Sequence, residues 1–219
     1  MMLGARTAAW AKSGGRIPSG WVKVEYIESD GVQLIDTGLI GTSDIKIHSK
    51  CALVYTKDIY PAMWGARKNS KDNDFQIYYN VSTAGGSPTS FILRTGRDQK
   101  QINASSLGIS GNLLGAVLDI ETYSGHISVN RHEFTTPSFN FTTPHSISMF
   151  CEWTIYRNEN FGAFRYYIFE AWRNGSQLIS LIPVRNATTN EGAMCDILTG
   201  DIYHNAGTGA FIIGPDKTT

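Results

Sequence analysis

Short runs of alternating apolar and polar residues, separated by glycine-containing turns, constrain the fold of this chain more than any other feature. The pairs between these runs tolerate the positive φ angles of tight turns: Asp30-Gly31, Ser124-Gly125, Asn174-Gly175 and Thr199-Gly200. No segment shows a sustained 3.6-residue period. The pattern therefore predicts an all-β chain, folded as a two-sheet antiparallel jelly-roll sandwich.

Three segments show the pattern most clearly. The run 44–55 (DIKIHSKCALVY) places its apolar residues in one register, interrupted only by Ser49, which predicts a long half-buried strand. The run 163–185 has two apolar halves joined by Asn174-Gly175, which predicts a hairpin. The stretch 23–38, centred on Asp30-Gly31, predicts another hairpin near the start of the fold.

Composition excludes several classes of partner. The chain has 19 basic and 19 acidic residues, so it has no overall field to attract nucleic acid or an anionic membrane. No apolar run reaches the roughly 18 residues that span a bilayer, and the N-terminus is a poor signal peptide, which favours synthesis in the cytoplasm. The wide separation of the three cysteines (Cys51, Cys151 and Cys195) argues against a disulfide framework or a zinc site, and Cys51 and Cys151, which lie inside apolar runs, are expected to be small buried side chains.

Residues 1–16 differ in kind from the rest of the chain. They are rich in alanine, carry Leu3 and Trp10, and lead into the flexible stretch SGGRIPSG. We therefore expect an N-terminal arm at 1–16 followed by a single β domain at 17–219, with Leu3 and Trp10 as anchors for a partner. Removal of the arm should leave a folded domain that no longer assembles.

Catalytic patterns are weak. Glu28 and Asp30 lie close together, and two carboxyl groups about 5 Å apart are what retaining glycoside hydrolysis requires. Gln33 stands where a further carboxylate would be needed, and Asp30 belongs to a turn, so we predict that the chain is not an enzyme. The five histidines lack a neighbouring nucleophile. No cofactor is expected, although Asp72, Asn73, Asp74 and Asp119 leave a structural calcium open.

The two ends of the chain carry more specific motifs. The opening stretch, 18–38, reads PSGWVKVEYIESDGVQLIDTG; MWGAR follows at Met63–Arg67; the closing stretches are YYIFEAWRNGSQLISLIPVRN (166–186) and GAMCDILTGDIYHNAGTGAFIIGP (192–215). Together they resemble the concanavalin A-like, or laminin-G-like, jelly-roll domains of tail and fibre proteins from bacteriophages and prophages of gut bacteria. The resemblance implies that the first and last strands pair and that Trp64 is structural. The middle of the chain, 69–144, matches no motif of the family.

Sugar binding requires an aromatic plate and a few polar groups, and the run 163–173 offers both. Glu170 should avoid the core, and Tyr166 and Trp172 share its parity, so these three residues are our candidate ligand stripe. The alternative is that these aromatic residues cover the rim of the core or a subunit contact.

The resemblance and the arm lead to one functional hypothesis and two rivals. The hypothesis is a non-enzymatic structural protein of a phage or prophage virion, located in a fibre, tail or capsid. Its partners would be other virion proteins through the arm, a bacterial surface glycan and further copies of itself in a homo-oligomer. The rivals are a free carbohydrate-binding module or adhesin, and a degenerate glycoside hydrolase.

Overall fold

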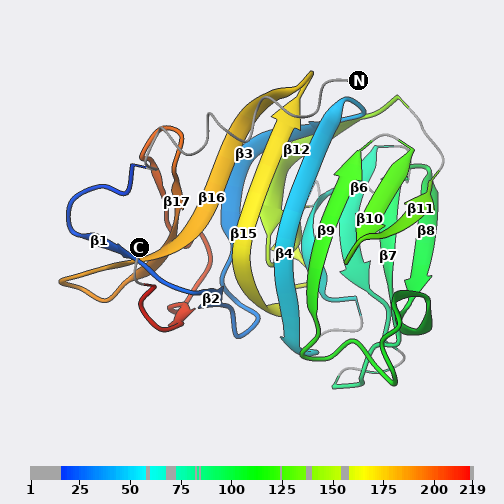
Figure 1. The fold of residues 1–219 in the computed structure, drawn as a ribbon, viewed down its shortest axis with the longest axis horizontal. Coiled ribbons are helices and arrows are strands. Elements are labelled where there is room, and N and C mark those ends of the chain that lie inside the picture. The colour runs from blue at the N-terminus through cyan, green and yellow to red at the C-terminus, as the bar shows by residue number, and fades with distance from the viewer. Residues whose placement is uncertain are drawn as a thin grey trace.

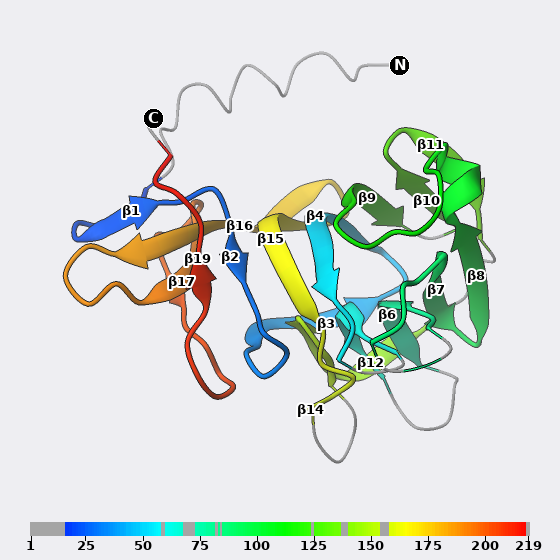
Figure 2. The same ribbon diagram turned by 90° about the horizontal axis from the view of Figure 1, so that it is seen from below.

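The fold consists of two β-sheets packed face to face (Figure 1 and Figure 2). A computed structural model describes residues 16–57, 60–67, 73–81, 83, 85–123, 125–136, 140–153 and 158–217. Within these ranges, helical structure is confined to one 3-10 turn, Ala104–Leu107. The predicted jelly-roll sandwich is confirmed.

The first sheet contains both ends of the fold. Its main path runs β11-β10-β9-β4-β15-β16-β17-β18, and three short strands join it at the side. The bounds are β1 (Trp21–Lys23), β2 (Ile27–Glu28), β4 (Ile45–Tyr55), β9 (Val117–Tyr123), β10 (His126–Val129), β11 (His132–Thr135), β15 (Ala163–Arg173), β16 (Ser176–Asn186), β17 (Gly192–Asp196), β18 (Ile202–Tyr203) and β19 (Ile212–Ile213).

The second sheet is built from the middle of the chain. Its path runs β14-β13-β5-β6-β7-β8, and β12 connects β5 to β3. The bounds are β3 (Ile35–Thr42), β5 (Ala62–Ala66), β6 (Asp74–Tyr79), β7 (Ser90–Gly96), β8 (Asp98–Asn103), β12 (Thr142–Met149), β13 (Glu152–Trp153) and β14 (Asn158–Glu159). Every pairing in both sheets is antiparallel except the short parallel pair of β13 with β5.

The main core lies between the two sheets. Alternate residues of β4 are buried there, as predicted from the run 44–55. Trp64 of β5 is fully buried and donates its indole N–H to Ser49 Oγ of β4, 3.3 Å away across the two layers. Its ring also packs edge-on against Phe75 at 4.9 Å between centroids. The structural role expected for Trp64 is confirmed.

The predicted hairpin at Asn174-Gly175 is present. Both residues have positive φ, 50° and 76°, and Arg173 pairs with Ser176 across the turn between β15 and β16. Positive φ at both central positions is the geometry that this dipeptide favours, because the resulting twist matches that of the flanking strands.

The prediction of a hairpin at Asp30-Gly31 is wrong. Gly31 does turn with a φ of 92°, but the strands on its two sides do not pair with each other. Strand β2 pairs with β15 and β19 in the first sheet, whereas β3 pairs with β12 in the second. The turn is therefore a corner that carries the chain from one sheet to the other.

The opening and closing segments lie side by side, although the strand that pairs with the last strand, β19, is β2, while the first strand, β1, pairs with β16. Ile27 of β2 pairs with Ile213 of β19. We call the contact between residues 29–34 and 205–210 the terminal clasp. Within it, the Gln33 amide donates to the carbonyl of Ala210 at 3.0 Å, and Asn205 Oδ1 accepts from the N–H of Leu34 at 3.1 Å. The opening and closing motifs thus hold each other in place.

The predicted arm falls almost wholly outside the described residues. Leu3 and Trp10 are among those outside, so their anchoring role stays a prediction. Arg16 is described, and its backbone N–H donates to the carbonyl of Ile197 at 3.4 Å. No helix in the described part of the chain has the length and apolar character of a membrane span.

Candidate functional site

A cleft of about 310 Å³ opens on the outer face of the second sheet. We call it the Arg94 cleft. Its lining combines two tyrosines, two arginines and several amide side chains: Tyr60, Arg67, Gln76, Tyr78, Asn80, Ile92, Arg94, Gln99, Glu152 and Asn160. Planar polar groups beside aromatic rings are the combination that binds small polar ligands.

Strand alternation places the central residues of the cleft. In β6, Phe75 and Ile77 point into the core, so Gln76 and Tyr78 point outward. In β7, Leu93 is likewise buried in the core, which sends Arg94 into the cleft. Because β6 and β7 pair directly, Gln76 stands opposite Arg94 in the sheet.

Arg94 is the hub of the cleft. Its guanidinium donates to Asp74 Oδ2 at 3.3 Å, to the Tyr78 hydroxyl at 3.2 Å and to Gln99 Oε1 at 3.1 Å. It also lies 5.5 Å from the centroid of the Tyr78 ring, within cation–π range. These contacts fix the guanidinium plane.

Glu152 enters the cleft from a distant part of the chain. Phe150, fully buried, takes a φ of 71°, which is rare for a bulky residue and turns the chain sharply after β12. Glu152 then pairs in parallel with Gly65, and its carboxylate lies 3.1 Å from Arg67 Nε and accepts from the Asn160 amide. A second carboxylate–guanidinium pair thus forms in the cleft.

The cleft floor depends on a glycine. A Cβ at Gly65 would lie 2.4 Å from Cβ of Gln76, so only glycine lets the glutamine side chain lie across β5. Gln76 is 1% exposed, and its Oε1 has no hydrogen-bond partner among the described residues. A buried polar atom without a partner is costly, so a hydrogen-bond donor that reached this oxygen would be favoured.

Two tyrosines form the aromatic part. Tyr60 is 42% exposed, and its ring meets that of Tyr78 edge-on at 5.9 Å. Burial raises the pKa of Tyr78, and the Arg94 guanidinium offsets only part of the rise. The Tyr78 hydroxyl therefore stays protonated at neutral pH and can both donate and accept.

The predicted ligand stripe of Tyr166, Glu170 and Trp172 is not assembled. Tyr166 is fully buried, and its hydroxyl donates to the carbonyl of Met63 at 2.6 Å. The prediction that it faces outward is wrong because β15 contains a bulge: Tyr166 pairs with Cys51 of β4, but Ile168 pairs with the very next β4 residue. The extra residue reverses the parity of the strand.

The other two residues of the stripe, Glu170 and Trp172, do lie on the outer face, but their side chains already contact other residues of the protein. Glu170 is 6% exposed and accepts from Ser180 Oγ at 2.9 Å and from the Gln177 amide at 3.1 Å. Trp172 is half-buried, with Lys46 Nζ 5.2 Å from its ring centroid. They support the surface of the first sheet.

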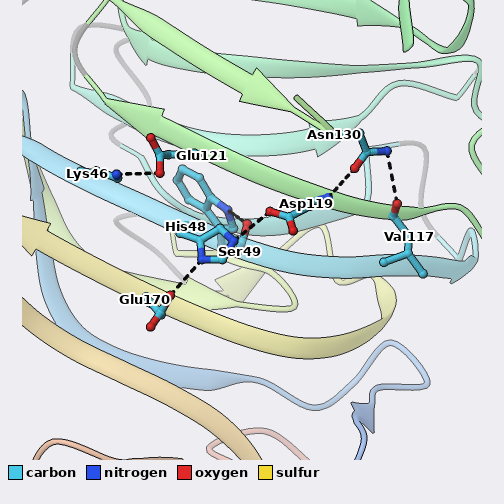
Figure 3. A network of polar contacts seen from close by, with 9 residues as sticks. Lys46, His48, Ser49, Val117, Asp119, Glu121, Asn130 and Glu170 are labelled. Atoms are coloured by element: carbon cyan, nitrogen blue, oxygen red, sulfur yellow. Dashed lines mark hydrogen bonds and ion pairs between the residues drawn. The ribbon is translucent and has the colours of Figure 1, made fainter. Parts of the chain in front are cut away.

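Figure 3 shows the polar network on that surface. The His48 ring joins Glu170, 2.9 Å from Nδ1, to Asp119, 2.8 Å from Nε2. Lys46 and Glu121 form a neighbouring ion pair at 2.6 Å. The described residues that line the hollow beside this network include no tyrosine, tryptophan or phenylalanine, which makes it a poorer sugar site than the Arg94 cleft.

Glu28 and Asp30, the two carboxylates weighed as a catalytic pair, have structural roles. Glu28 is 7% exposed and forms an ion pair with Arg165. The backbone N–H of Asp30 donates to Gln33 Oε1 at 2.9 Å, so this glutamine shapes the corner turn. Position 33 therefore requires an amide instead of a carboxylate, because the turn needs a side chain that both accepts and donates hydrogen bonds.

The calcium candidates do not converge. Asp74 pairs with Arg94 and Asp119 with His48, while Asp72 lies outside the described residues. No group of three or more histidine, cysteine or acidic residues in the described ranges could hold a metal ion. The three cysteines are buried and free, and the burial predicted for Cys51 and Cys151 is confirmed.

Neither protein-family models nor curated proteins match this chain. The functional argument therefore depends on the cleft itself. Sequence reasoning missed the cleft, although Gln76, Tyr78 and Arg94 occupy alternate positions of two successive strands, where a polar outward face can be recognised.

Proposed function

We propose that this chain is a non-enzymatic structural protein of a phage or prophage virion, whose jelly roll binds a glycan of the bacterial surface through the Arg94 cleft. The observation that carries the proposal is the combination of an exposed Tyr60 ring with a fixed set of planar donors and acceptors. An aromatic ring packs on the apolar face of a pyranose, and guanidinium and amide groups match its hydroxyls.

The position of the carboxylates favours binding over hydrolysis. A general acid must reach the leaving group to deliver its proton. In the cleft, Glu152 is paired with Arg67 and Asp74 with Arg94, and both carboxylates are only 1% exposed. Two buried carboxylates in ion pairs suit a role in holding the cleft together.

The virion role is supported by the terminal motifs and by the arm. The motifs that resemble phage tail and fibre proteins are those that form the terminal clasp, so they belong to the framework of the fold. In the proposal, residues 1–15 attach the domain to other virion proteins or to further copies of the chain. The cleft then presents its aromatic ring to the host surface.

Binding of the purified protein to a panel of bacterial surface polysaccharides tests the function. The wild type should bind at least one of them. The double variant Arg94→Met with Asp74→Asn, which leaves no unpaired buried charge, should keep its fold but lose binding because the hub of the cleft is removed. Arg131→Met is the matched control, since Arg131 is exposed at the turn between β10 and β11. Equal loss in both variants, or hydrolysis of any bound polysaccharide, would contradict the proposal.

A free carbohydrate-binding module is the second candidate, because the described residues that line the cleft all lie in the β fold, between Tyr60 and Asn160. Deletion of residues 1–15 separates the two. A virion protein should lose its assembly while keeping the affinity for the polysaccharide. A free module should show the same mass in solution and the same binding with or without these residues.

A further inference from the structure

We infer that the Arg94 cleft selects neutral saccharides and discriminates against those that carry a carboxylate, sulfate or phosphate. This inference rests on the proposed function, because it names the ligand class of the same cleft. Three properties of the described residues lead to it: the pairing of the charges, the need for a hydrogen-bond donor and the apolar part of the lining.

The charges of the cleft are already balanced. Arg67 Nε lies 3.1 Å from Glu152 Oε1, and Arg94 Nη1 lies 3.3 Å from Asp74 Oδ2. Both carboxylates are only 1% exposed. An anionic sugar that recruited either arginine would leave a buried carboxylate without its cation, and breaking such a pair is strongly unfavourable.

The hydrogen-bonding capacity of the cleft calls for a donor. Gln76 Oε1 is an acceptor that has no partner among the described residues. Ionised carboxylate, sulfate and phosphate groups only accept at neutral pH, whereas a sugar hydroxyl donates and accepts. A hydroxyl that reaches the glutamine oxygen can therefore donate to it and at the same time accept from a neighbouring amide or from Arg94.

The apolar part of the lining fits the C–H face of a sugar ring. Ile92 and Tyr78 are 6% and 7% exposed and pack with Ala62 into a small cluster on the outer face of the sheet. The Tyr60 ring extends this cluster to the rim. An uncharged pyranose can place its C–H groups here without carrying a charge into a buried region.

The test compares matched saccharides. The full chain is titrated with the polysaccharide fragments that it binds best, and with versions of the same fragments in which primary alcohols are oxidised to carboxylates, or carboxylates reduced to alcohols. The neutral member of each pair should bind about tenfold or more tightly. Its affinity should also stay constant within about twofold between roughly 50 and 500 mM salt, because no charge pairing is screened.

Two single substitutions, Tyr60→Ala and Tyr123→Ala, test whether the neutral saccharide binds in the Arg94 cleft. Tyr60 and Tyr123 are 42% and 43% exposed; Tyr60 precedes β5 of the second sheet, and Tyr123 ends β9 of the first. Affinity for the neutral fragment should fall about tenfold in Tyr60→Ala and stay within twofold in Tyr123→Ala. An affinity that is unchanged in Tyr60→Ala would overturn the assignment of the ligand to this cleft.

The remaining outcomes separate the inference from the proposed function. If no saccharide of either kind binds, the proposed function itself fails. If the acidic members bind more tightly, with an affinity that falls with salt and depends on Tyr60, the proposed function stands and the selection for neutral saccharides is refuted.

Discussion

Replacing Gln33 by leucine removes the side chain that joins the corner turn to the closing loop. Gln33 is 1% exposed. Its Oε1 accepts from Ser29 Oγ and from the N–H of Asp30, both at 2.9 Å, and its amide donates to the carbonyl of Ala210 at 3.0 Å. Leucine has a similar size but makes none of these bonds.

Three intramolecular hydrogen bonds at about 1 kcal/mol each amount to a loss of about 3 kcal/mol in the free energy of unfolding. Urea unfolding, followed by tryptophan fluorescence, measures this loss. Gln101→Leu is the matched control: Gln101 also donates two side-chain hydrogen bonds, to Ser90 and Asn103, but it is exposed to water, so its replacement should cost about 1 kcal/mol or less. A Gln33→Leu variant as stable as the control would refute the clasp as the link between the ends of the chain.

Three further predictions address other parts of the fold. Gly207→Ala should destabilise the clasp, because its Cβ would lie 2.3 Å from the carbonyl oxygen of Val32; an unchanged urea midpoint would contradict this. Burial lowers the pKa of His48, but hydrogen bonds to two carboxylates raise it more, to a net value above the ordinary 6.5. His48→Gln should therefore cost most stability below about pH 6.5 and progressively less as the pH rises through the folded-state pKa, whereas a cost independent of pH would count against the network. Burial also raises the pKa of the three thiols, that of Cys195 to about 11, so a thiol reagent at neutral pH should label none in the native protein and all after unfolding.

Local patterns in the sequence predicted those parts of the fold that depend on local physics. The alternation in 44–55 and the Asn174-Gly175 turn each require only neighbouring residues to specify their structure. The pairing of the opening and closing segments is not local, and it could be expected only from the resemblance of the terminal motifs. The hydrogen bonds of Gln33 now supply its physical basis.

The wrong predictions concern features that depend on pairing between strands far apart in the sequence. The bulge after Tyr166 is set by the register of β15 against β4, and nothing in the run 163–173 distinguishes it from a regular strand. Asp30-Gly31 has the composition of a hairpin turn, but the partners of its flanking strands lie far along the chain. The same limit applies to the cleft, because Glu152 joins Gln76 and Arg94 only after the chain has folded.

Chemical-shift mapping of the isotope-labelled protein tests the location of the glycan site most directly. The saccharide that binds best is titrated into the protein, and the backbone amide signals are followed. The signals of Gln76, Tyr78 and Arg94 should shift with a common dissociation constant, while those around His48 stay in place. Shifts centred on His48 and Asp119, with the Arg94 cleft unaffected, would contradict a glycan site on the second sheet.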